Sequence, residues 1–179
     1  MRRRALVWVL LAAPCMAQIP SGIGGAFTLV GGAGRVVTDA DLHGKFLLVM
    51  FGYTSCPDVC PATLYKIAQA LRLLGAKAAR LRVVFITIDP VRDTPALTAR
   101  YAALFSNRII GLSGSPAQLR QVEAEYHVYV GVKDPRTGAI AHSALLYLMD
   151  PSGHFVAALP DESSAQELVS RLTALMSVH

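Results

Sequence analysis

The sequence contains little cysteine, asparagine or charge, and these scarcities limit what the protein can be. Three cysteines and one asparagine occur among 179 residues, and charged residues make up 16% of the chain. The charges are dispersed and no internal repeat or low-complexity tract is present, which excludes long disordered regions. The apolar content of 53% and the length instead indicate one globular domain with a sizeable core.

The N-terminal 17 residues lack a membrane-spanning run but carry the features of an export signal. Three arginines at 2–4 precede a short apolar stretch at 5–13, and small residues allow cleavage after Ala17. A spanning helix needs about 20 apolar residues, and Pro14 interrupts this run. We expect a cleaved signal at 1–17, a flexible lead at 18–25, a folded domain at 26–179 and a periplasmic location. An uncleaved inner-membrane anchor facing the periplasm is the alternative.

Cleavage would change both the charge and the cysteine content. It removes three arginines and no acid, so the formal net charge falls from +5 to +2, and the high pI gives no argument for nucleic-acid binding. It also removes Cys15 and leaves Cys56 and Cys60 as the only cysteines. In an oxidising compartment such a pair forms a disulfide unless it is reduced.

The chain is organised around residues 46–64, which join a strand to a helix. The apolar run at 46–51 suits a strand buried on both faces, and a helical period begins at Leu64. If the helix starts near Pro57, Cys56 and Cys60 lie on one side of its first turn. Unpaired amides and the helix dipole favour thiolates there. Such a pair suits a soft metal or a reversible disulfide, because a structural bridge usually closes a longer loop.

The remaining pattern predicts an α/β protein. A hairpin is expected from 26–30 and 34–37, and alternating strands and helices follow it. Further strands are predicted at 81–88, 109–112, 128–132, 143–149 and 154–158. Helices are predicted after the caps Thr94 and Ser115 and after a capping box at 163–166. We therefore predict a thioredoxin-like fold, with a central mixed sheet flanked by helices and an N-terminal hairpin extension.

Residues 52–61 strongly resemble the signature of the Sco/SenC family, the copper chaperones of cytochrome c oxidase assembly. They read Gly-Tyr-Thr-Ser-Cys-Pro-Asp-Val-Cys-Pro. Further blocks that look like family landmarks lie at 89–95, 111–114, 126–129 and 142–150. The resemblance covers essentially the whole chain from Phe27 onward.

The resemblance implies a thioredoxin fold that binds copper through Cys56, Cys60 and His142. Two thiolates are soft donors that favour Cu(I), and an imidazole helps such a site to accept Cu(II) as well. The family usually has an acid before the histidine, where this chain has Ala141, which affects how the ring is oriented or tuned. Family members are also commonly held by a transmembrane segment, which the short N-terminal run here does not match.

The implied function is a metallochaperone rather than an enzyme. It would deliver copper during assembly of the CuA centre, with linked dithiol redox chemistry. The implied partners are the oxidase subunit that carries the CuA site and another periplasmic copper chaperone or a thiol reductase, close to a membrane. Two acids are possible supporting residues: Asp58 in the first turn of the cysteine helix and Asp93 before the Thr94 cap. Each also has an ordinary structural explanation.

Two other functions use the same cysteines. A thiol–disulfide reductase would maintain the cysteines of the oxidase copper site or of another exported protein. Such enzymes normally separate their cysteines by two residues, whereas three intervene here, and they do not need His142. A peroxidase of the peroxiredoxin type is suggested by Val-Cys-Pro at 59–61, but the proline expected upstream is replaced by Tyr53.

We expect the exported protein to begin near Gln18 and to be soluble in the periplasm. Intact-mass measurement of protein recovered from the periplasm tests this. A full-length N-terminus on protein that fractionates with membranes would favour the anchor instead.

Overall fold

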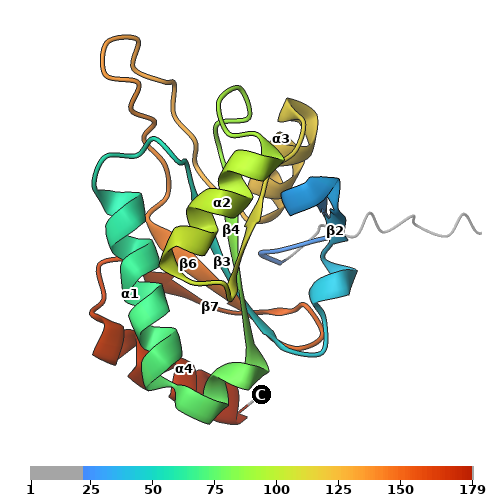
Figure 1. Ribbon diagram of the computed structural model, residues 1–179. Helices are drawn as coiled ribbons and strands as arrows, with labels where there is room; N and C mark the ends of the chain where they lie inside the picture. Colours follow the sequence, from blue (N-terminus) through green and yellow to red (C-terminus); the bar gives the residue numbers. More distant parts are fainter. Residues whose placement is uncertain (1–21, 179) are drawn as a thin grey trace, which may run out of the picture.

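The central feature of the fold is a five-stranded mixed sheet (Figure 1). The computed structural model describes residues 22–178, so the predicted signal lies outside the described residues. The strand order is β5-β4-β3-β6-β7. The central strand β3 runs parallel to β4 and antiparallel to β6, while β4–β5 is parallel and β6–β7 antiparallel. The strands are β3 Phe46–Gly52, β4 Leu81–Thr87, β5 Ile109–Leu112, β6 Leu145–Met149 and β7 Phe155–Pro160.

Helices cover both faces of this sheet, and each face has its own core. The α-helices are α1 Val59–Leu73, α2 Pro95–Phe105, α3 Pro116–Glu125 and α4 Ala165–Val178. Alternate residues of β3 divide between the cores: Phe46, Leu48 and Met50 pack with α1 and α4, and the residues between them pack with α3 and the N-terminal hairpin. Every residue of β3 is buried, as its unbroken apolar run predicted.

The N-terminal hairpin is confirmed as a separate two-stranded sheet. Its strands are β1 Thr28–Val30 and β2 Val36–Thr38, paired antiparallel around the single 3-10 turn η1 Gly32–Gly34. Within the lead, Gly24 donates a hydrogen bond from its N–H to the carbonyl of Glu125 at 2.7 Å. The predicted fold class, an α/β protein with a mixed sheet and this extension, is confirmed.

Three local predictions need correction. The cysteine helix begins at Val59 rather than near Pro57, so Cys56 precedes it. Residues 128–132 are not a strand, because only one isolated bridge joins Val130 to His142. The capping box of α4 lies one residue later than predicted: Ser164 and Glu167 exchange hydrogen bonds, so Ser163 lies outside it. Helix α1 ends at Leu73, and the 3-10 segment η3 Gly75–Arg80 follows it.

The two other caps are as predicted. Thr94 accepts the N–H of Leu97, and Ser115 forms a complete capping box with Gln118. In both helices proline occupies the first turn, where its missing N–H costs no hydrogen bond. Among the described helices, none has both the length and the apolar character needed to cross a bilayer.

The corrected cap of α4 is tested with adjacent serines. Ser164→Ala removes the side-chain acceptor for the Glu167 N–H and should lower the free energy of unfolding by about 1 kcal/mol. Ser163→Ala is the matched control and should change it by less than about 0.5 kcal/mol. Urea unfolding of both variants decides, and a larger loss for Ser163→Ala would restore the original register.

Candidate metal centre

The cysteine motif begins where β3 ends, and a buried carboxylate fixes the loop between them. Asp93 is 0% exposed. It accepts hydrogen bonds from the Thr54 N–H at 2.8 Å, the Thr54 hydroxyl at 2.6 Å and the Thr87 hydroxyl at 2.6 Å. Because Thr87 ends β4 and Thr54 follows β3, this one side chain holds the loop to the carboxyl ends of two parallel strands. The backbone just before Cys56 is thereby ordered.

The two cysteines differ in burial. Cys60 is 0% exposed, whereas Cys56 is half-buried, and both are free thiols. The N–H of Cys60 donates to the Sγ of Cys56 at 3.3 Å, so the first sulfur lies against an amide of the first turn of α1.

Space for the buried sulfur depends on the last residue of β3. A Cβ atom added at Gly52 would lie 2.8 Å from the Cys60 Sγ and 2.9 Å from the ring of Phe85. Neither neighbour can move far in a packed interior. Position 52 therefore needs glycine, because any side chain there would collide with Cys60 or Phe85. The backbone of β3 forms one wall of the site.

The third predicted donor, His142, reaches the buried sulfur. Its Nε2 lies 3.9 Å from the Cys60 Sγ. Its Nδ1 lies 3.0 Å from the carbonyl oxygen of Ser143. A carbonyl only accepts, so Nδ1 carries the proton of the neutral ring, and the Nε2 lone pair faces the sulfur. The ring is thus oriented for binding a metal through Nε2.

His142 is carried by an excursion that we call the histidine arm, residues 129–143. The arm lies between α3 and β6 in the sequence and projects from the body of the protein (Figure 1). Its two halves pair with each other. The N–H of Gly131 donates to Ala141 at 2.7 Å, and that of Ser143 donates to Tyr129 at 3.1 Å. This self-pairing explains why residues 128–132 looked like a strand although they join no sheet.

A cavity of about 310 Å³ lies between the arm and the cysteine motif. Most of its lining is apolar, and both Cys56 and His142 open into it. Its lining residues are Tyr53, Cys56, Pro57, Asp58, Val59, Ala139, Ile140, Ala141, His142 and Ala144. A ligand on another molecule can therefore approach two of the three donors from this side.

Burial also sets the protonation of the inner thiol. Desolvation raises the pKa of Cys60 well above its usual range, which a backbone hydrogen bond from Tyr53 only partly offsets. The buried carboxyl of Asp161 nearby has its own pKa raised by desolvation, against the opposing effects of Lys66 and His142. Cys60 is thus a neutral thiol, and a metal ion bound through its sulfur would have to displace the proton.

The three donors approach one another without forming a finished cage. Across residues 22–178, no three His, Cys, Asp or Glu side chains are already arranged to hold a metal ion. The imidazole and the inner sulfur lie close together, whereas the Cys56 sulfur is directed at the Cys60 N–H. Binding through all three donors would therefore require a local adjustment, and Cys56 and His142 are both only half-buried.

The two acids singled out from the sequence have different places. Asp93 orders the loop and binds threonine donors rather than approaching the sulfurs. Asp58 is exposed at the N-cap of α1, where its side chain makes no capping hydrogen bond. Sequence reasoning missed Tyr53, which contacts both the motif and the arm, because an aromatic residue after a buried strand carries no specific signal.

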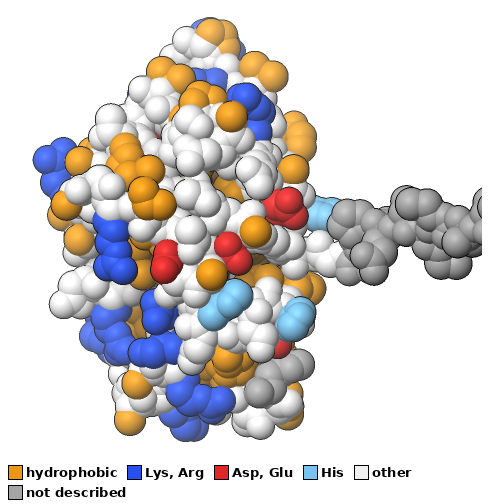
Figure 2. Space-filling view, turned by 90° about the vertical axis from the view of Figure 1, so that its right-hand side faces the viewer, with side chains coloured by type: hydrophobic (Ala, Val, Ile, Leu, Met, Phe, Trp, Pro, Cys, Tyr) orange, Lys and Arg blue, Asp and Glu red, His pale blue; other side chains and the backbone are white. Residues whose placement is uncertain are grey.

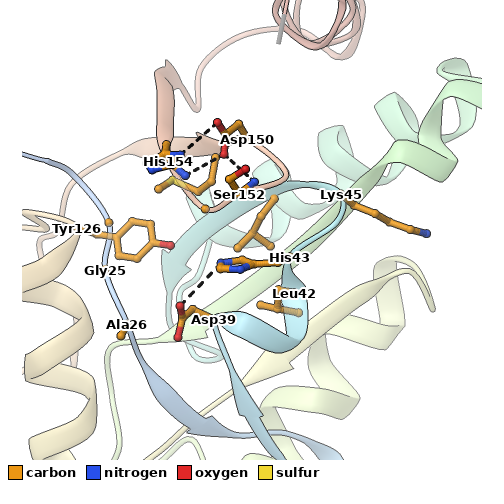
Figure 3. A pocket seen from close by; sticks show the side chains of 14 residues that line it. Gly25, Ala26, Asp39, Leu42, His43, Lys45, Tyr126, Asp150, Ser152 and His154 are labelled. Atoms are coloured by element: carbon orange, nitrogen blue, oxygen red, sulfur yellow. Dashed lines mark hydrogen bonds and ion pairs between the residues drawn. The ribbon is translucent and has the colours of Figure 1, made fainter.

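Two further histidines among the described residues lie away from this site. His43 and His154 border a separate cavity of about 220 Å³ (Figure 3). Each is close to an aspartate, with 3.8 Å between His43 Nε2 and Asp39 and 3.5 Å between His154 Nδ1 and Asp150. On the face in Figure 2, acidic and histidine side chains lie near the middle, and Lys and Arg gather over the lower left. None of the lining residues of this cavity belongs to the cysteine motif.

Comparison with known proteins identifies close relatives. The family model described as SCO1/SenC matches residues 16–177. The bovine mitochondrial protein named SCO2 homolog is 39% identical over 158 residues, which are 86% of this chain and 59% of that protein. The chain spans about three fifths of the length of the curated relatives it matches.

Solved structures resemble the whole described fold. Bradyrhizobium japonicum ScoI with copper bound is 41% identical with a TM-score of 0.76, and the match covers 86% of this chain and 99% of that one. Yeast Sco1 with copper bound is 34% identical with a TM-score of 0.81, covering 88% and 90% respectively.

The roles of the two acids are separated by matched substitutions. Asp93→Asn places an amide NH2 against donors that need acceptors, so it should lower the free energy of unfolding by about 2 kcal/mol or more. Asp58→Asn, at an exposed position without a cap bond, should change it by less than about 0.5 kcal/mol. Equal losses in chemical denaturation would contradict the ordering role of Asp93.

Proposed function

Because the chain belongs to the SCO1/SenC family, we propose that it is a metallochaperone that binds copper through Cys56, Cys60 and His142. Its proposed task is to deliver copper during assembly of the CuA centre of cytochrome c oxidase. The predicted family membership is confirmed. The copper bound in the ScoI and Sco1 structures supports the proposed cargo.

The observation that carries the proposal is the approach of His142 Nε2 to Cys60 Sγ at 3.9 Å. Metal bonds of about 2.3 Å to sulfur and about 2.0 Å to nitrogen put the two donors about 3.7 Å apart in a trigonal site. The observed separation is about 0.2 Å longer than that requirement, so these two donors need little movement to share an ion. Two sulfurs and one imidazole form a donor set that accepts Cu(I) and also Cu(II).

The unequal burial of the donors suggests an order for transfer. Cys60 lies in the core beside Gly52, whereas Cys56 and His142 line the open cavity. An incoming ligand would therefore displace Cys56 or His142 first, while Cys60 keeps hold of the ion until the recipient has bound it. Each sulfur regains a proton as copper leaves.

Redox chemistry belongs to the same proposal. Exchange with the disulfide of a partner protein would form the Cys56–Cys60 disulfide, with two electrons and two protons passing to the partner as two thiols, and the oxidised motif then lacks both thiolate ligands. A periplasmic thiol reductase would restore the dithiol before copper loading. We also propose export by a signal at 1–17, a folded domain at 26–179, a periplasmic location near the membrane, and the oxidase subunit that carries CuA as recipient.

A thiol–disulfide reductase is the second candidate. The pairing of a half-buried Cys56 with a buried Cys60 at a helix start favours it, because a partner's disulfide can reach the outer sulfur while the inner one resolves the mixed disulfide. This function does not use the imidazole, so His142 separates the two candidates.

His142→Ala should largely abolish Cu(II) binding while only partly weakening Cu(I) binding, because Cu(I) tolerates two sulfur ligands. Cys56→Ala and Cys60→Ala should damage both. The measurements are competition titrations of reduced protein in both copper states, with thiol exchange assayed in parallel. His127→Ala, an exposed histidine outside the site, is the control.

Two results would contradict the proposed site. Cu(II) binding by His142→Ala at wild-type strength would remove the imidazole from the ligand set and favour the reductase. Equal copper stoichiometry for the oxidised and the reduced wild-type protein would show that the dithiol is not the site.

A further inference from the structure

We propose that Tyr53 is the positioning residue that holds the histidine arm over the dithiol, through its hydroxyl group. The inference rests on the proposed copper site and adds a residue that sets how firmly the imidazole is held there. Tyr53 lies inside the cysteine motif, but it is neither one of the proposed metal ligands nor a reacting thiol.

Tyr53 contacts both halves of the site. It is 3% exposed, and its hydroxyl accepts the Ile140 N–H at 3.2 Å. Its ring meets the His142 ring edge-on, with centroids 6.1 Å apart and 87° between the planes. Its backbone carbonyl accepts the Cys56 N–H at 3.2 Å. One residue therefore joins the backbone of the cysteine loop to the arm two residues before the metal histidine.

The arm also packs Val130 and Ile140 against the core. Apart from the His142–Cys60 contact, its other polar contacts with the described body of the protein lie toward its outer end. Lys133 Nζ pairs with Asp89 at 2.7 Å, and the Arg92 guanidinium donates to the Gly138 carbonyl at 3.3 Å. These contacts restrain the tip. The tyrosine hydroxyl instead restrains the strand of the arm that carries His142, so it bears most directly on the 3.9 Å separation of nitrogen and sulfur.

The hydrogen bond of Tyr53 is also costly to lose. Ile140 is 8% exposed, and its N–H is buried together with its acceptor. A buried N–H without a partner carries the full desolvation penalty of that group. Removing only the hydroxyl, by Tyr53→Phe, therefore favours an arm that moves away so that water can reach the Ile140 amide, although the aromatic ring stays.

The consequence differs between the copper states. Cu(I) remains held by two sulfurs when the imidazole withdraws, whereas Cu(II) depends on the nitrogen donor. Residues that orient a ligand typically change metal affinity about 10- to 100-fold when they are removed. Tyr53→Phe should therefore lower Cu(II) affinity about tenfold or more and leave Cu(I) affinity within about threefold of wild type.

The test uses the reduced full domain and Tyr53→Phe, with Tyr129→Phe as matched control. Tyr129 lies on the same arm with a side chain 65% exposed, so its hydroxyl should not matter. Competition titration gives both copper affinities, and electron paramagnetic resonance of the Cu(II) form reports whether the nitrogen ligand is retained. Unchanged Cu(II) affinity and spectrum in Tyr53→Phe would overturn the proposal. An equal loss of both copper states would do so too, because it would indicate a general structural defect.

A metal-free measurement separates this inference from the proposed function. Amide hydrogen exchange at Ile140 should accelerate at least tenfold in Tyr53→Phe and stay at the wild-type rate in Tyr129→Phe, without any copper present. Exchange at an unchanged rate in Tyr53→Phe overturns the positioning role even if copper binds as proposed. Conversely, failure of the wild type to bind copper defeats the proposed function and leaves this result readable.

Discussion

The site depends on one buried acidic side chain and the hydrogen bonds that it accepts. Asp93 has no solvent access and is kept as an acceptor by the threonines that follow β3 and end β4. Its own backbone carbonyl accepts the Ser113 hydroxyl at 2.5 Å, which links the same point to the end of β5. Three parallel strands are thus tied together at their carboxyl ends. The cysteine loop, α1 and one side of the cavity follow directly after these fixed strand ends.

From that fixed end, the site places two similar sulfurs in unlike surroundings. Cys60 is enclosed by the core, with the Gly52 backbone against it and its pKa raised by desolvation. Cys56 lies before the helix and opens into the cavity. In the proposed site, the dry sulfur would hold the ion tightly and the accessible one would allow ligand exchange. The spacing of the two cysteines in the sequence does not by itself predict which sulfur is buried and which is accessible.

The sequence predicted those parts of the fold that depend on local chemistry. The apolar run of β3, the hairpin and the caps of α2 and α3, each followed by a proline, were all identified, because each rests on periodicity or on a few neighbouring residues. The cap of α4 was misplaced by one residue because two adjacent serines offer the same hydroxyl, and only the packing chooses Ser164. The 128–132 segment was misjudged because β-branched residues also suit an arm that pairs with itself.

The approach of His142 to Cys60 was expected only from the family resemblance, since 82 residues separate them in the chain. Tyr53 and Ile140 are separated by a similar number of residues in the chain, and no local sequence pattern predicts their contact.

The arm is fastened by two kinds of force, and they respond differently to the surrounding solution. The Lys133–Asp89 pair at its outer end is an ion pair whose lysine is partly exposed, so dissolved salt weakens it. The hydroxyl–amide bond near His142 is buried and uncharged, so ionic strength hardly affects it. As salt rises, the tip loses support from this ion pair and keeps the hydrogen bond from Arg92 to the Gly138 carbonyl, while the segment beside the histidine stays in place. Ionic strength therefore loosens the outer end of the arm more than the end that carries His142.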